Sequence, residues 1–167
     1  RVDLNGAVVT PGFFEVDTKL GLVEVGLEAS SVDHAGGGDH ANYGSFMVGE
    51  AFNPRSSLIA ITRAGSITHA VVSPSGGLIS GQSALVKLDG LTQADTVQDW
   101  SAAMHASMQW SGSRANGLQK LRALFTEAQA LARDPQHWKE KRTHLSDSAK
   151  ADIQALIPVL DGRTPLV

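Results

Sequence analysis

Two ionisable residues, Asp17 and Lys19, end a short apolar run that follows a Pro-Gly turn. The run from Phe13 to Val16 has the aromatic and β-branched residues typical of a strand buried on both faces. Residues two apart on a strand point to the same face, so we expect these two side chains to share one. Gly21 then lets the chain turn sharply. A strand that ends in two such groups is how a (β/α) barrel begins an active site.

The stretch from Pro11 to Gly21 resembles the first barrel strand of the amidohydrolase superfamily, in the branch related to imidazolonepropionase. The family pattern runs Pro-Gly, aromatic or aliphatic, acidic, x-His-x-His-x-Gly, and its two histidines bind the catalytic metal. In this sequence Asp17 and Lys19 stand at the two histidine positions. The resemblance extends over 53–90 and from Ser113 into the residues that follow.

This resemblance implies an α/β fold, a partial (β/α) TIM-like barrel of the metal-dependent hydrolase type that is incomplete in this chain. It also implies a hydrolase of C–N bonds in amides or cyclic amides, acting on a small molecule. The altered motif keeps a second hypothesis open. The chain would then be a non-catalytic relative that binds a small molecule or a partner through the former active-site mouth.

The two altered positions decide which cofactor is expected. Asp17 could still ligate a divalent metal such as zinc, whereas a protonated Lys19 has no lone pair to give. The alternative is a metal-free site in which the two side chains form a salt bridge, each offsetting the cost of burying the other. We therefore expect either no cofactor or a divalent metal.

A glycine-rich segment, Ser30 to Ser45, is predicted to be a loop and carries two further Asp-His pairs, Asp33-His34 and Asp39-His40. Both residue types ligate metals, and a flexible loop could bring them together. The alternative is a solvated, mobile loop, because the spacing matches no strong metal-site pattern. His34 and His40 are accordingly candidate binding residues.

A second loop, Ser73 to Gly81, follows a predicted strand and would lie at the active-site end of a barrel. Its backbone N–H groups could bind an oxyanion or a phosphate, or the loop could be a structural turn. The loop lacks the Gly-Lys-Ser/Thr of a P-loop, so the sequence does not support a nucleotide site of that type. The chain has no Gly-x-Ser-x-Gly elbow, so a serine hydrolase has no support either. The candidate binding residues are Ser75, Gly76, Gly77 and Gly81.

Alternating β and α patterns predict the elements that position these groups. The second half of the chain is predicted to be mainly helical, with Ser113 and Ser146 as N-caps. The expected elements are a strand pair or hairpin arm at 1–9, a helix at 54–64, strands at 67–72 and 78–88, an extended segment at 100–110, helices at 113–132, from 135 and from 146, and a strand at 164–167.

The order of these elements suggests how the chain is organised. By the resemblance, residues 1–10 are the remnant of a small β-sandwich, and 11–167 are the N-terminal portion of a barrel, cut in mid-strand. We therefore expect exposed strand edges and apolar faces. The partner that covers them would be the remainder of the same chain or a second copy in a homo-oligomer.

Composition excludes several other classes. The 167 residues are 42% hydrophobic with a net charge of −3, which is typical of a soluble globular protein of the cytoplasm or periplasm. There is no basic cluster to suggest nucleic-acid binding and no apolar run long enough for a membrane span. The absence of cysteine excludes disulfides, thiolate zinc sites and cysteine nucleophiles.

Overall fold

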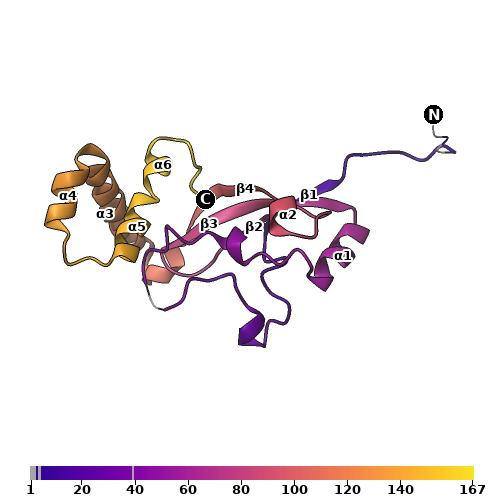
Figure 1. Ribbon diagram of the computed structural model, residues 1–167, viewed down its shortest axis with the longest axis horizontal. Helices are drawn as coiled ribbons and strands as arrows, with labels where there is room; N and C mark the ends of the chain where they lie inside the picture. The colour runs from indigo at the N-terminus through magenta and orange to yellow at the C-terminus, as the bar shows by residue number, and fades with distance from the viewer. Residues whose placement is uncertain (1–2, 4, 39) are drawn as a thin grey trace.

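The computed structural model describes residues 3, 5–38 and 40–167, without the side chains of 110 and 111. Its centre is a four-stranded sheet in the order β1-β2-β3-β4 (Figure 1). β1 and β2 are parallel, whereas β2, β3 and β4 run antiparallel to their neighbours, so the sheet is open and mixed. The strands are β1 (Phe13–Thr18), β2 (Ile67–Val72), β3 (Ile79–Lys87) and β4 (Val97–Ala106).

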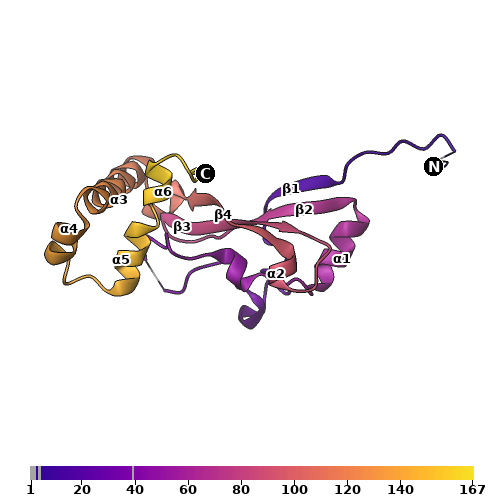
Figure 2. The same ribbon diagram turned by 45° about the horizontal axis from the view of Figure 1, so that its top comes forward.

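The helices form two groups at opposite ends of the sheet (Figures 1 and 2). One end has α1, and the other has α3 to α6. None of the described helices is long and apolar enough to cross a bilayer. The helices are η1 (Ala29–Ser31), η2 (Val48–Ala51), α1 (Ser57–Ala64), α2 (Gln93–Thr96), η3 (Met108–Ser111), α3 (Arg114–Arg133), α4 (Pro135–Lys141), α5 (Asp147–Gln154) and α6 (Ile157–Leu160).

Two hydrophobic clusters match these two groups. The first packs one face of β2 and β3 against α1 and η2, with Phe52 and Val72 almost fully buried. The second packs Ile79 and Met104, from β3 and β4, against the helices around Leu156. Each end of the sheet therefore packs against its own group of helices.

The first strand departs from its prediction. β1 forms where the sequence expects it, but it lies at the edge of the sheet. Its apolar side chains are exposed: 62% for Phe13, 51% for Phe14 and 65% for Val16. The expectation of burial on both faces was wrong: Phe13 and Phe14 are consecutive and point to opposite faces of this edge strand, and both remain exposed. The expectation of exposed edges and apolar faces is confirmed.

Helix starts follow local capping. Ser113 and Ser146 cap α3 and α5 as predicted, each accepting a hydrogen bond from a backbone N–H within the first turn. The α1 prediction began three residues early. Asn53 accepts from the N–H of Arg55, which makes a separate turn, and Ser56 caps the helix.

The two ends of the chain also test the predictions. Asn5 and Gly6 form the expected turn, but 7–12 form no strand, and Figure 1 shows this arm extending away from the sheet. Residues 1, 2 and 4 lie outside the described residues. At the other end, 165–167 pair in parallel with β4, through hydrogen bonds that join Met104 to Pro165 and Val167. Among the described residues, an isolated bridge at Leu166 therefore forms where a strand was predicted at 164–167, and α3 to α6 form the crossover to it.

Candidate functional site at the carboxyl ends of β1 and β2

Lys19 lies just beyond the carboxyl end of β1 and joins it to the loop after β2. Because β1 and β2 are parallel, their carboxyl ends meet at the same edge of the sheet. The Nζ atom of Lys19 donates to the backbone oxygens of Ser73 at 2.7 Å and of Pro74 at 3.1 Å. Burial lowers the pKa of this half-buried ammonium, and the negative charge of Asp17 partly opposes that shift. Lys19 is therefore a positive charge held in place by two carbonyl dipoles.

Asp17 interrupts the regular strand. Its φ is +59°, in the left-handed region that non-glycine residues seldom adopt. The register with β2 is irregular between Glu15 and Thr18, where this residue lies. Simple alternation therefore does not place Asp17 and Lys19 on one face. The expected salt bridge is absent from the ion pairs of the described residues, and the exposed carboxylate acts on the ammonium only through space.

His105 belongs to this site, although no sequence pattern pointed to it. It lies on β4 opposite Gly81 of β3. Burial lowers the pKa of its imidazole, and the charges of Asp17 and Lys19 both act on it. Within the described residues, its Nε2 is buried without a hydrogen-bond partner, as is the Oγ of Ser73. The only sequence signal was the polar position of His105 in an alternating strand, and sheet pairing supplies the rest.

The predicted loop residues His34 and Ser75 come together. His34 Nδ1 and Ser75 Oγ share a hydrogen bond of 2.8 Å, and the Ser75 N–H donates to the His34 carbonyl at 2.8 Å. Farther along, Asn42 and Met47 form parallel bridges with β3. The glycine-rich segment thus packs along the first half of β3, beyond the point where β2 ends.

The candidate glycines have different surroundings. Gly76 is exposed, whereas Gly77 and Gly81 are buried. A Cβ on Gly77 would lie 2.8 Å from the ring of Tyr43, and one on Gly81 would lie 2.6 Å from the Phe46 carbonyl oxygen. Both have positive φ. These two glycines allow the glycine-rich segment to lie against the second loop and β3.

His40 lies in different surroundings from His34 and Ser75. Its ring packs edge-on against Tyr43, with 5.8 Å between ring centroids, and it lines a cavity beside α5. Its predicted neighbour Asp39 lies outside the described residues. Within the described ranges, which omit that residue, no three His, Asp or Glu side chains are arranged to hold a metal ion.

Comparison with known proteins bears on the fold. No protein-family model and no curated protein matches the sequence. The crystal structure of an amidohydrolase from Thermotoga maritima aligns with this chain at a TM-score of 0.78 and 17% sequence identity. The two share a fold. The match covers 99% of this chain and 48% of the other, so this chain spans about half the length of its structural neighbour.

Proposed function

We propose that this chain is an amidohydrolase-like protein that hydrolyses C–N bonds of amides or cyclic amides at a site without the usual catalytic metal. The observation that carries the proposal is the fold match, which extends over nearly the whole chain. The altered motif, Asp17 and Lys19, lies at the carboxyl end of β1, where barrel enzymes hold their reacting groups.

Lys19 does not fit as a zinc ligand, so Asp17 and Lys19 together do not make the two-ligand motif of a zinc site. A zinc ligand must offer a lone pair. Lys19 instead makes two hydrogen bonds as a donor to carbonyl oxygens, which is the geometry of an ammonium. We therefore assign the chemistry to the side chains themselves.

Lys19 is suited to polarise the substrate carbonyl. An ammonium has three N–H donors, and two of them are used. The third can bind the oxygen that becomes negative when water attacks the amide carbon. Because the ammonium is already oriented by the chain, this stabilisation needs little rearrangement.

Asp17 is suited to act as the general base. The carboxylate of Asp17 is exposed, and it is close enough to Lys19 for its negative charge to oppose the lowering of the ammonium pKa. In the proposed step, the water oxygen bonds to the carbonyl carbon while a water proton passes to Asp17. The C–N bond then breaks, and the leaving amine takes that proton.

Assays of hydrolysis with N-acyl amino acids and cyclic amides test this proposal. We expect activity that survives chelators and falls at least a hundredfold in Asp17→Asn and in Lys19→Met, with Lys87→Met as the control. Elemental analysis should find no stoichiometric zinc. Chelator-sensitive hydrolysis, or activity unchanged in both variants, would contradict the metal-free site.

A second candidate function is binding without catalysis. It is favoured by the buried Oγ of Ser73 and Nε2 of His105, which have no hydrogen-bond partner in the described part of the chain and could hydrogen-bond a ligand. Ligand binding with no hydrolysis of any substrate would support it. The double variant Asp17→His, Lys19→His offers a further distinction, because it should bind zinc if the other ligands of an amidohydrolase site are present.

A further inference from the structure

A cavity of about 560 Å³ lies outside the site described above, between the glycine-rich segment and the helices α3 and α5. Its volume is in the range that holds a small organic molecule. Leu124, Leu145 and Ile153 supply apolar lining, and the exposed residues His40 and His144 contribute imidazole rings to it.

One pair of charges on the cavity wall is already neutralised. Arg142 donates to both carboxylate oxygens of Glu127, at 2.6 and 3.1 Å, and Trp138 Nε1 donates to the same carboxylate at 2.9 Å. These bonds lower the pKa of Glu127, with the Arg142 bond as the main cause. The pair therefore contributes little net charge to a ligand in the cavity.

Asp152 differs from Glu127, because its carboxylate forms no ion pair among the described residues. It lines the cavity from α5 and is half-buried, and none of the ion pairs among the described residues includes it. Its Oδ1 accepts from the N–H of Ser45 at 2.9 Å and from the Ser45 hydroxyl at 2.5 Å. Within the described part of the chain, no hydrogen bond reaches Oδ2. A half-buried carboxylate with one free oxygen favours a cationic donor.

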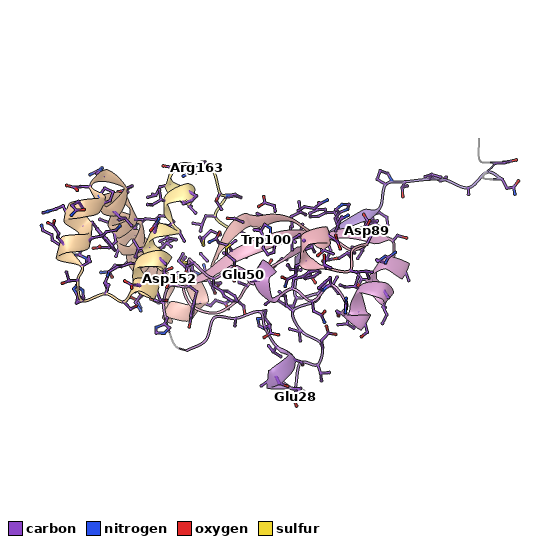
Figure 3. The ribbon with its side chains drawn as sticks, in the orientation of Figure 1. Glu28, Glu50, Asp89, Trp100, Asp152 and Arg163 are labelled. Carbon is purple, nitrogen blue, oxygen red and sulfur yellow. The ribbon has the colours of Figure 1, made fainter. Side chains whose placement is uncertain are left out.

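The position of Asp152 is rigidly defined. A Cβ on Gly44 would come within 2.5 Å of the Asp152 carbonyl oxygen, so α5 and the glycine-rich segment are in direct contact here. Figure 3 labels Asp152 at this junction between the helical end and the sheet. A fixed carboxylate loses little conformational entropy when a ligand binds.

We propose that this cavity is a second binding site, which takes a small organic amine with an apolar body. The ammonium group donates to Asp152 Oδ2, and the apolar body lies on Leu124, Leu145 and Ile153. The imidazole rings of His40 and His144 flank the ligand. Charge complementarity selects an amine over a carboxylate of the same shape, because among the described Asp, Glu, Lys and Arg residues that line the cavity Asp152 alone is outside an ion pair.

Phenethylamine and 3-phenylpropanoate are matched probes, since both join a phenyl ring to a charged group through a short chain. We expect titration calorimetry and amide chemical shifts to detect the amine and not the carboxylate. Asp152→Asn should weaken amine binding at least tenfold while keeping the oxygen that Ser45 uses. Asp147→Asn, on the same helix but outside the cavity, is the control and should leave affinity unchanged.

Ala149→Leu tests the cavity itself, because Ala149 lines it and a larger side chain would fill it. We expect loss of amine binding with an unchanged circular dichroism spectrum. Equal binding of the two probes, undiminished affinity in Asp152→Asn, or no binding of the amine would overturn the proposal. Hydrolysis at the Lys19 site should be unaffected by Asp152→Asn, so the two proposals fail separately.

Discussion

Lys19 shows how the fold accommodates a cationic donor at the end of a strand. An imidazole at this position could present a lone pair to a metal, whereas an ammonium must be surrounded by acceptors. The loop after β2 provides two backbone oxygens for this purpose. The chain itself therefore places an oriented positive charge at this point. The same charge disfavours protonation of His105, although burial is the larger cause of its lowered pKa.

His105 predicts a pH dependence of stability. Its pKa is lowered from 6.5 in the folded state, so the unfolded chain binds this proton more readily. The contribution of His105 to the free energy of unfolding should therefore be constant above about pH 6.5. Stability should then decrease as the pH falls through that value toward the folded pKa. Urea unfolding followed by tryptophan fluorescence would measure this loss.

The variant His105→Leu removes the titrating group and the unpartnered Nε2 together. We expect a flatter dependence of the free energy of unfolding on pH between about 7.5 and 5.5. His137→Ala, at an exposed position on α4, is the matched control and should keep the slope of the unaltered protein. An equal slope in His105→Leu and the unaltered protein would show that another group titrates.

At the scale of elements, β3 depends on Gly81. Its φ is +119°, and an added Cβ would lie 2.6 Å from the Phe46 carbonyl oxygen. That oxygen accepts the N–H of Gln82, so it cannot move freely. Gly81→Ala should destabilise the fold by more than about 2 kcal/mol, combining backbone strain with a clash against backbone.

The control for Gly81 is Gly37, an exposed residue of the glycine-rich segment. Gly37 does not have a positive φ, and an added Cβ would meet nothing within 4 Å. Gly37→Ala should therefore change stability by less than about 0.5 kcal/mol. Thermal unfolding of the two variants checks the difference. Similar melting temperatures would mean that the glycine-rich segment does not stay packed on β3.

Local sequence was sufficient for several elements. A continuous apolar and β-branched run gave β2 with its observed bounds, Ile67–Val72, and a serine cap with an apolar stripe gave α3. The α1 start was misplaced because Asn53 and Ser56 both accept backbone hydrogen bonds, and only the second does so for the helix. Which of two nearby caps is used depends on side-chain contacts, such as the bonds that Glu24 accepts from both residues.

The placement of Lys19 beside the loop after β2 was predictable, but the hydrogen bonds around it were not. Parallel pairing brings Lys19 to the loop after β2, and the order of elements was enough to expect this. The left-handed φ of Asp17 and the approach of His105 depend on irregular pairing and on a strand far along the chain. The His34–Ser75 bond likewise joins residues 41 positions apart. The hydrophobic periodicity of a short segment cannot reveal contacts between residues so far apart in the sequence.

At the scale of the molecule, the sheet has an uncovered edge. β1 pairs with β2 on one side, and the described chain offers no strand on the other. Phe13, Phe14 and Val16 expose apolar surface along this edge. In the structural neighbour, about half of the chain lies beyond the part matched here. An edge with unpaired backbone groups and apolar side chains favours addition of another strand.

We therefore expect this chain to self-associate through β1 when it is studied alone. Sedimentation velocity should show the average mass rising with protein concentration. Val16→Lys should shift this association to higher concentration, because a lysine on an edge strand opposes pairing with another strand. Leu27→Lys is the matched control: Leu27 is also apolar and is 101% exposed, but it lies outside β1. If both variants reduced association equally, general surface hydrophobicity would be the cause. A monomer at all concentrations would show that the edge of β1 is protected without a partner.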